Sequence, residues 1–456
     1  MKSATCLVLM AIYLFPGAYA ADLLDVYDSA LNSDPQLREA DALRLASLET
    51  RPQARAGLLP QVALFATETD QGQDGLSSQF GQDGFIDTLI DSDTDQTFYG
   101  LSVTQPLFRW DQWLSLKQAD KVVAQADVDY AVVKQELIVR VAVGYFDVLA
   151  ARDDVEAAAA NKEAIARQLE QAETRFEVGL IAITDVEESR AAYDQAIATE
   201  IQAKRLLATA RENLRELTGS YVESLEGLEA GLALSAPVPA DDEAWVNTAM
   251  ENNLSLLSTR LDVEIAKDTI NVERAGHFPT LDLVVRRNEF DSKSDQQLRF
   301  PPAPGAIDSP TRSDFSTGAV ELQFNLPIYS GGSTSSRVRE SVYRHRAARE
   351  RLERVARETE REIRDAYLGV LSDVATIRAL EQALSSSETA LRATEAGFDV
   401  GTRTSVDVLN ARRNLLNART NLARSRYDYV INMLRLKRAA GTLSLDDLRE
   451  VNGWLD

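Results

Sequence analysis

One stretch of this sequence occurs twice, and each copy lies between two long helical patterns. The first copy covers residues 175–186 (RFEVGLIAITDV) and the second covers residues 397–410 (GFDVGTRTSVDVLN). In each copy a glycine follows a Phe-x-Val segment, and glycine readily adopts the left-handed conformation that often ends a helix. A Thr or Ser just before the Asp-Val pair can cap the next helix. The repeated stretch therefore predicts two tight helical hairpins, with tips at residues 176–185 and 398–407.

The elements around the tips are duplicated in the same order. The string AGLLP at residues 56–60 recurs as AGHFP at residues 275–279, and matching positions lie about 220 residues apart. The segment from Trp110 to Thr174 contains no proline and predicts one helix about 100 Å long. Shorter helical patterns cover residues 22–55 and 245–274. We expect a first repeat over residues 21–219, an equatorial linker over 220–240, a second repeat over 241–441 and a C-terminal tail over 442–456.

Period-two alternation of apolar and polar residues predicts two β-hairpins, at residues 61–107 and 280–328. Each is expected to contain two strands of about ten residues, long enough to cross a membrane, around a polar loop. The first loop is expected to end at Asp95, and the second to run from Asp291 to Ser313. Residues 70–95 are rich in aspartate, but their spacing does not match a calcium-loop motif, so a solvated acidic loop is favoured over a calcium site.

Residues 1–20 have the form of a secretory signal peptide, because Lys2 precedes an apolar run that ends in the small-x-small motif Ala18-Tyr19-Ala20. Cys6, the only cysteine, lies inside that run, so the exported protein would carry no thiol, disulfide or lipoprotein anchor. No later apolar stretch reaches the roughly 18 residues of a membrane helix. If the chain spans a membrane it must do so as a β-barrel, and four strands cannot close one alone. The chain must therefore oligomerise through its strands, and geometry alone permits two or three copies.

The remaining composition argues against several functional classes. The net charge of −22 disfavours nucleic acid as a partner. The two histidines, His277 and His345, have no Cys or acidic neighbour at ligand spacing, so neither a metal site nor a cofactor is expected. The sequence shows no convergent set of nucleophile, base and metal ligands, and we expect that the protein is not an enzyme.

The two tip strings closely resemble the periplasmic turns of the TolC family of outer-membrane channel-tunnels. The resemblance covers nearly the whole mature chain, including residues 426–432 and 441–443. It implies a homotrimer in which long antiparallel helical hairpins form a periplasmic α-barrel and four strands per chain form a twelve-stranded β-barrel. Alanine-rich stretches at residues 157–160 and 191–192 favour such a hollow cylinder over a solid coiled-coil rod.

The resemblance also implies a function and a set of partners. The trimer would be an exit duct in the outer membrane, extending into the periplasm, for efflux of small molecules or type I secretion of proteins. A periplasmic adaptor and an inner-membrane ABC exporter or proton-driven pump would engage it. The sequence does not name the cargo or the pump.

Matching positions of the family motif imply a gate latch at the tips. Arg403 lies where the family's second tip has an arginine that bonds the first tip, and Thr184 and Asp185 lie where its partners are. Such an Arg–carboxylate link is charge-assisted and therefore strong for its size. Phe398 occupies the position of a tyrosine that hydrogen-bonds the aspartate in close members, so that bond is absent here.

The same comparison implies a constriction and a docking surface. Asp407 lies where three copies would form an acidic ring, and Asn410 replaces a second ring aspartate one helical turn away. The ring would then carry three carboxylates and not six. The adaptor is expected to dock on the exposed tip residues Gly179, Leu180, Gly401 and Thr402.

A different class of protein remains open on the sequence alone, namely a periplasmic coiled-coil scaffold or adaptor without a membrane-spanning sheet. The strand residues discriminate between the two classes, because a soluble scaffold has no need of outward-facing apolar side chains at Val320, Leu322, Phe324 and Leu326.

Overall fold

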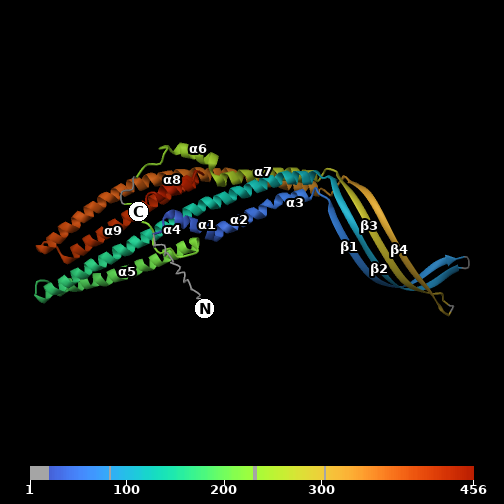
Figure 1. Ribbon diagram of the computed structural model, residues 1–456, viewed down its shortest axis with the longest axis horizontal. Coiled ribbons are helices and arrows are strands. Elements are labelled where there is room, and N and C mark those ends of the chain that lie inside the picture. Colours follow the sequence, from blue (N-terminus) through green and yellow to red (C-terminus); the bar gives the residue numbers. More distant parts are fainter. Residues whose placement is uncertain (1–19, 82–83, 230–233, 302–303, 456) are drawn as a thin grey trace, which may run out of the picture. The chain divides into compact units, whose positions relative to one another are not determined.

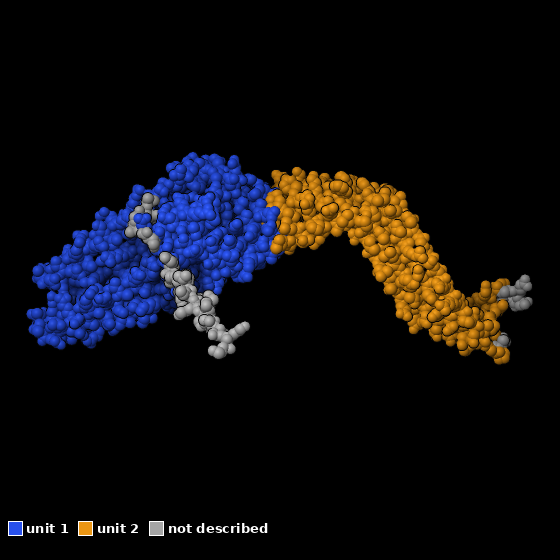
Figure 2. Space-filling view, in the orientation of Figure 1, with its two compact units in different colours: residues 1–44, 127–260, 351–456 blue, residues 45–126, 261–350 orange. Residues whose placement is uncertain are grey.

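The structure, a computed structural model, describes residues 20–81, 84–229, 234–301 and 304–455. They form two compact units (Figures 1 and 2). Unit 1 takes in the described residues of 1–44, 127–260 and 351–456, and unit 2 takes in the described residues of 45–126 and 261–350. The predicted signal peptide, residues 1–20, lies outside the described residues except for Ala20.

Unit 1 contains the tips of two long helical hairpins and the parts of the helices that lead to them. The first is formed by α4 (Trp110–Glu177) and α5 (Ile183–Thr218), and the second by α8 (Ser333–Asp399) and α9 (Ser405–Ala439) (Figure 1). The 68 residues of α4 contain no proline, so the backbone hydrogen bonds run without a break, as the sequence predicts. None of the helices in the described part of the chain is both long and apolar enough to cross a membrane.

Large buried side chains join the two hairpins around Phe146 and Tyr427, and small buried side chains lie between the helices nearer the tips. Tyr145 and Phe146 of α4 are fully buried, and the Phe146 ring stacks on Tyr427 of α9 with the ring centroids 5.5 Å apart. The Tyr427 hydroxyl donates to Asp153 at 2.7 Å, which ties α9 to α4. Buried apolar residues nearer the tips of α4 and α5 are mostly alanines: Ala158, Ala172, Ala196 and Ala203. These small side chains let the helices lie close together, in agreement with the predicted lateral packing.

The short helical pattern of each repeat is interrupted once or twice, whereas the sequence predicts it as continuous. Residues 23–56 form α1 (Leu23–Ser33), α2 (Pro35–Leu48) and α3 (Thr50–Ala56), and residues 242–275 form α6 (Asp242–Asn252) and α7 (Leu254–Ala275). The breaks at Asp34 and Asn253 have one cause. Each side chain caps the following helix, Asp34 by accepting the Leu37 N–H at 3.0 Å and Asn253 by accepting the Leu256 N–H at 2.9 Å. The duplication thus extends to equivalent helix caps.

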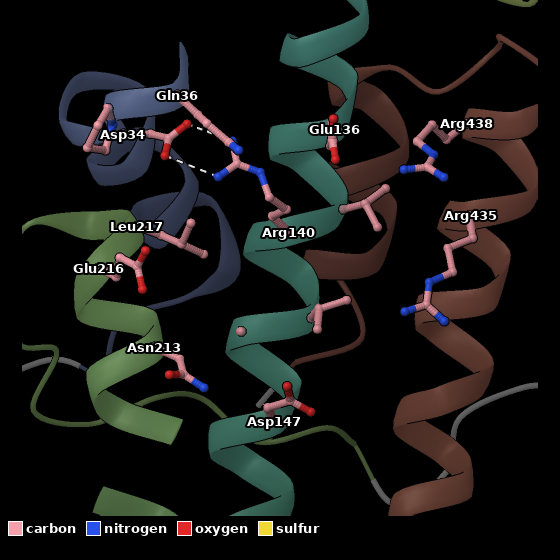
Figure 3. Close-up of a pocket in the computed structure, with 14 residues that line it drawn as sticks. Asp34, Gln36, Glu136, Arg140, Asp147, Asn213, Glu216, Leu217, Arg435 and Arg438 are labelled. Atoms are coloured by element: carbon pink, nitrogen blue, oxygen red, sulfur yellow. Dashed lines mark hydrogen bonds and ion pairs between the residues drawn. The ribbon is translucent and has the colours of Figure 1, made fainter. Parts of the chain in front are cut away.

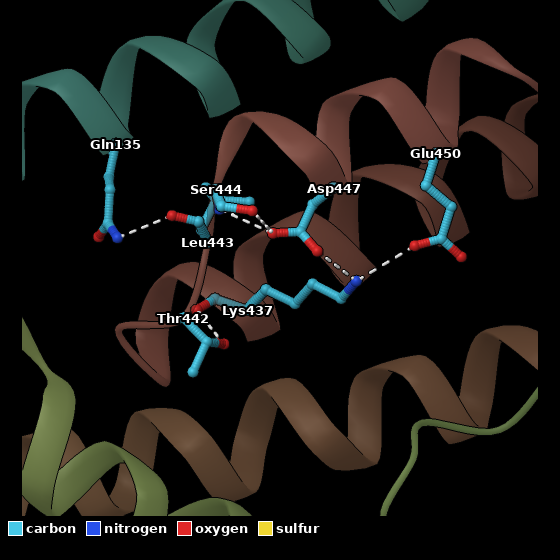
Figure 4. A network of polar contacts seen from close by, with 7 residues as sticks. All are labelled: Gln135, Lys437, Thr442, Leu443, Ser444, Asp447 and Glu450. Carbon is cyan, nitrogen blue, oxygen red and sulfur yellow. Dashed lines mark hydrogen bonds and ion pairs between the residues drawn. The ribbon is translucent and has the colours of Figure 1, made fainter.

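The C-terminal segment, expected as a tail, folds back as a packed helix, α10 (Leu445–Asn452). Figure 4 shows its attachment: Lys437 of α9 pairs with Asp447 at 2.6 Å and with Glu450 at 3.4 Å. Burial alone would lower the pKa of Lys437, but its hydrogen bond to Asp447 and the neighbouring carboxylates raise it, so the lysine stays charged. Leu448 is fully buried and Asn452 accepts the Leu24 N–H, so the two ends of the described chain meet.

Unit 2 contains a four-stranded antiparallel sheet in the order β1-β2-β3-β4. The strands are β1 (Gln61–Gly81), β2 (Gly84–Phe108), β3 (Thr280–Arg299) and β4 (Ala306–Asn325). The two hairpins begin and end near the predicted positions, but the long polar loops predicted inside them are wrong. The ladder pairs residues such as Asp70 with Asp95 and Asp291 with Asp314, so most of both loops is strand. Ser and Thr between the aspartates support extended backbone, and alternation places the carboxylates on one solvent-exposed face.

The register gives the sheet two different faces. Val62, Val103, Val285 and Val320 lie in one row across all four strands, and this side is called the apolar face. Its side chains are exposed in the single chain, as the 73% exposure of Val320 shows. The opposite side, called the polar face, carries an Arg286–Glu321 ion pair at 3.6 Å and an Arg109–Asp282 pair joined by two hydrogen bonds at 3.0 and 2.7 Å. The predicted apolar-polar alternation is confirmed.

Candidate functional site

The first hairpin tip joins α4 to α5 through a left-handed glycine. Gly179 has φ of 75°, its N–H donates to Phe176 O at 2.8 Å, and the Leu180 N–H donates to Arg175 O at 2.9 Å. Asp185 then accepts the Ala182 N–H at 3.3 Å and so helps to begin α5. The N-cap position of α5 is Ala182, and Thr184 is an exposed residue inside the first turn. The prediction that Thr184 caps this helix is therefore wrong by two positions.

The second tip joins α8 to α9 in the same way, with a stronger cap. Gly401 has φ of 77°, and the Thr402 N–H donates to Gly397 O at 2.8 Å. Thr404 is the N-cap: its hydroxyl accepts the Asp407 N–H at 3.2 Å, while the Asp407 carboxylate accepts the Thr404 N–H at 3.0 Å. Both predicted glycine stops are confirmed, and a threonine caps the second helix as expected.

The two tips of one chain lie against each other. The Gln168 side chain donates to Ser405 O at 3.3 Å, and the hydroxyls of Ser189 and Ser405 are 3.4 Å apart in buried surroundings. Arg175 of the first tip pairs with Asp399 of the second at 3.6 Å, and its guanidinium lies over the Phe398 ring at 4.8 Å from the centroid. An arginine-centred link therefore joins the tips within a single chain.

The residues of the predicted latch lie at these tips but do not join within one chain. Arg403 is exposed and its aliphatic part packs over Gly397, where a Cβ would lie 2.8 Å from Arg403 Cγ. Within the described residues of this chain, Arg403 makes no ion pair with Asp185 and no hydrogen bond to Thr184. Its charge instead acts on the Asp407 carboxylate of the same chain, whose pKa it helps to lower.

Sequence reasoning missed the Arg175–Asp399 link. A signal was present, because the two matching strings carry an arginine just before one phenylalanine and an aspartate just after the other. That comparison between the strings would have suggested opposite charges at corresponding levels of two adjacent hairpins. The side chains are 27% and 67% exposed, so the ion pair itself contributes only about 0–1 kcal/mol.

The electrostatics of the second tip keep Asp407 ionised. The Thr404 N–H and hydroxyl donate hydrogen bonds to its carboxylate, and with the nearby Arg403 charge they lower the pKa of Asp407 below its usual range. Asn410, one turn further along α9, accepts a hydrogen bond from Arg413 at 3.2 Å. Each chain thus offers one carboxylate and one amide at this level.

A cavity of about 710 Å³ in unit 1 lies between α4, α5 and α9 (Figure 3). Arg435 and Arg438 extend into it from α9, facing Glu136 and Asp147 of α4, and the Asp34–Arg140 pair is part of its lining. Charges of both signs line it without a nucleophile beside a base. Across the described residues, no group of three His, Cys, Asp or Glu side chains is placed to hold a metal ion.

Comparison with known proteins gives the class of the chain. The family model described as outer membrane efflux protein matches residues 26–220 and 245–442. The chain belongs to the outer membrane efflux protein family. The two matches correspond to the two predicted repeats, and together with the resemblance noted above they confirm the internal duplication.

Comparison with individual relatives supports the same family assignment. It is 36% identical over 442 residues to outer membrane protein TolC of Vibrio cholerae serotype O1, covering 97% of this chain and 95% of that protein. It is 29% identical to alkaline protease secretion protein AprF of Pseudomonas aeruginosa, covering 95% and 87% of the two chains. Its fold is similar to that of outer membrane protein VceC from Vibrio cholerae, with a TM-score of 0.71, 20% identity, and coverage of 92% and 96%.

These findings confirm the predicted class and location of this efflux-protein family member. The chain is an outer-membrane exit duct component that extends into the periplasm. The relatives are named as outer membrane and secretion proteins, so the alternative of a periplasmic scaffold without a membrane sheet is not supported. The positions of the latch, the constriction and the docking surface remain predictions.

Proposed function

We propose that three copies of this chain form one continuous exit duct, with the strands closed into a twelve-stranded sheet in the outer membrane and the hairpins forming a tunnel in the periplasm. The observation that carries the proposal is the four-stranded sheet itself. Its strands β1 and β4 are open edges, and its apolar face is exposed at Val62, Val320 and Phe324. Unpaired backbone groups at open edges are not tolerated in lipid, so strands of other copies must pair with both edges.

The tips are the surface that we assign to a periplasmic adaptor. Val178, Leu180 and Val400 are 67%, 73% and 75% exposed, so each hairpin ends in unpaired apolar side chains beside Gly179 or Gly401. Exposed apolar groups of this kind at a rigid helical end mark an interaction site. An inner-membrane ABC exporter or proton-driven pump would act through the adaptor. The names of the relatives, which include a protease secretion protein and a probable efflux pump protein, support both protein and small-molecule cargo.

The gate is assigned to contacts between neighbouring copies. Arg403 of one copy would pair with Asp185 and hydrogen-bond to Thr184 of the next, while Arg175 holds the two tips of each copy together. The exposed Arg403 side chain and the exposed Thr184 support this assignment. Phe398 offers its ring face to Arg175 in place of a hydrogen bond to Asp185. Charge-assisted hydrogen bonds contribute roughly 1.5–3 kcal/mol each, so three equivalent links could hold the tips closed and still yield to a bound partner.

Single-channel recording in planar bilayers tests the duct and its gate. Arg403→Ser is expected to raise conductance, because it removes the link between copies. Arg392→Ser is the matched control, since Arg392 is an exposed arginine of α8 bonded only to Thr389 among the contacts described, and it should leave conductance unchanged. A wild-type protein that forms no channels would contradict the duct, and unchanged conductance in Arg403→Ser would place the latch elsewhere.

The same recording tests the constriction. Asp407→Ala is expected to weaken block by divalent and trivalent cations, because Asn410 has no charge to bind them. Asp407→Asn separates charge from helix capping, since the amide oxygen can still accept the Thr404 N–H. Both variants should weaken the block. If only the alanine variant does so, the carboxylate acts through the cap and not through a charged ring.

A further inference from the structure

The polar face of the sheet carries four phenylalanines that its alternation does not predict. Phe98, Phe290 and Phe315 lie opposite one another in a single row across β2, β3 and β4. Phe65 of β1 pairs with Gly100, two residues from Phe98 and on the same face. The ring centroids of Phe65 and Phe98 are 5.4 Å apart, and those of Phe290 and Phe315 are 4.9 Å apart. Two adjacent ring pairs therefore extend across all four strands.

A glycine makes room for this cluster. A Cβ at Gly100 would lie 2.7 Å from Cζ of Phe65, so the Phe65 ring occupies the space above that glycine. With no side chain at Gly100, the Phe65 ring can lie along the sheet toward Phe98. The arrangement of the rings therefore depends on two positions of the sequence, Gly100 and Phe65.

The rings interrupt a surface that is otherwise polar. On the side of the row toward the helix-connected ends of the strands, the same face carries the Arg286–Glu321 ion pair. On the other side, its next two rows contain only uncharged polar residues: Thr69, Gln96, Ser292 and Ser313, then Gln71, Thr94, Ser294 and Thr311. The phenylalanines therefore belong to a water-facing surface and not to the apolar face.

The opposite face becomes acidic near the level of the rings. Glu68, Asp291 and Asp314 lie on this apolar face in the row next to Phe98 and Phe290. Asp70 and Asp95 lie three rows from Phe98, in a row that also contains Lys293 and Arg312. The chain's net charge of −22 adds a negative potential, which raises the local concentration of cations relative to anions. Because the carboxylates lie on the other side of the sheet from the rings, selection among cations rests on the ring faces themselves.

We propose that these four phenylalanines form an aromatic girdle in the lumen of the duct, where cations bearing aromatic groups bind transiently on their way out. The proposal rests on the proposed function, because only closure of the sheet by three copies turns the polar face into a lumen. Phenyl faces attract organic cations and stack against aromatic solutes. A small cation that keeps its water shell gains neither contact.

Block of single channels by tetraphenylphosphonium tests the girdle. Tetraphenylphosphonium is added on the side of the bilayer that is reached by the hairpin turns of the sheet, opposite the helix-connected ends of the strands. Mg²⁺ is the comparison cation. Wild-type channels are expected to be blocked reversibly by tetraphenylphosphonium. In the triple variant Phe98→Leu, Phe290→Leu and Phe315→Leu, apolar packing remains but three of the four aromatic faces are lost, so this block should weaken about tenfold while Mg²⁺ block is unchanged.

The matched control is the double variant Phe80→Leu and Phe85→Leu. Those rings form a similar pair, 5.2 Å apart, on the opposite face near the far end of β1 and β2, so their loss should not change the block. If the triple variant does not assemble, Phe315→Leu alone removes a ring that is 52% exposed and should weaken the block about threefold.

Unchanged tetraphenylphosphonium block in the conducting variant would overturn the girdle, and so would equal weakening in the Phe80 and Phe85 variant. The outcomes separate the two proposals. Wild-type protein that forms no channels contradicts the duct, whereas wild-type channels that conduct but are not blocked contradict the girdle alone.

Discussion

Replacing Gly401 with leucine is expected to abolish export while leaving assembly and membrane insertion intact. Gly401 has φ of 77°, and nothing lies within 4 Å of the position that a Cβ would take. A leucine there meets no clash inside the chain but adds local backbone strain of about 1–2 kcal/mol and bulk at the surface assigned to the adaptor. Export of a marker cargo from a strain that lacks the wild-type protein measures the effect.

Two further variants separate docking from backbone strain. Gly331→Leu is the matched control, because Gly331 also has positive φ, 63°, and open space around its Cβ position, but it precedes α8 and is not part of a tip. It should export normally. Gly401→Asn keeps a residue that tolerates the left-handed conformation and still adds a side chain, so it should also lose export. Normal export by Gly401→Asn would show that the conformation matters and that close approach of a partner does not.

Replacing Asp34 with alanine is expected to destabilise unit 1 by about 3 kcal/mol, because it leaves the Arg140 charge without its partner. Asp34 is 2% exposed and accepts two hydrogen bonds from Arg140, at 3.1 and 2.6 Å. Asn253→Ala is the comparison: it removes the equivalent cap of the second repeat and the hydrogen bond that Asn253 donates to Ala439 O at 2.8 Å, but no ion pair, and should cost about 1–2 kcal/mol. Thermal unfolding of the detergent-solubilised protein compares the two. Equal losses would show that Asp34 acts only as a cap.

The stability that the Asp34 carboxylate provides is expected to depend on pH. Burial alone would raise the pKa of Asp34, but hydrogen bonds from Arg140 and from the Leu37 N–H outweigh burial and lower it. A carboxylate with a lowered folded-state pKa contributes stability above its unfolded pKa of about 3.9, and that stability is lost as the pH falls through the folded pKa. The difference between wild type and Asp34→Ala should therefore be constant near neutral pH and shrink below about pH 4.

The long helices and both tips could be predicted because their signals are local. A helix such as α4 needs only a sustained apolar period and the absence of proline, and Gly179 and Gly401 stop helices through their own conformational freedom. The breaks at Asp34 and Asn253 were missed because the apolar pattern continues across them. The capping side chains, together with Pro35 in the first repeat, were the available signal.

The strand lengths could not be predicted in the same way. The outer halves of the strands have no continuous apolar face, so their alternation of Asp with Ser, Thr and Gln is easily mistaken for a loop. Pairing across strands, such as Asp93 with Asp295, depends on register between segments about 200 residues apart, which local patterns do not encode. The Arg175–Asp399 link was missed for a related reason, since it depends on how two separate hairpins align.

The mass of the detergent-purified protein tests the central claim most directly. Closure of the sheet requires that the edges β1 and β4 pair with strands of other copies, so native mass spectrometry should show one species with three times the mass of the mature chain. The protein should also remain in the membrane fraction when membranes are washed with alkali. A stable monomer that retains the sheet would contradict the account, because its two open edges would then have no partner in lipid.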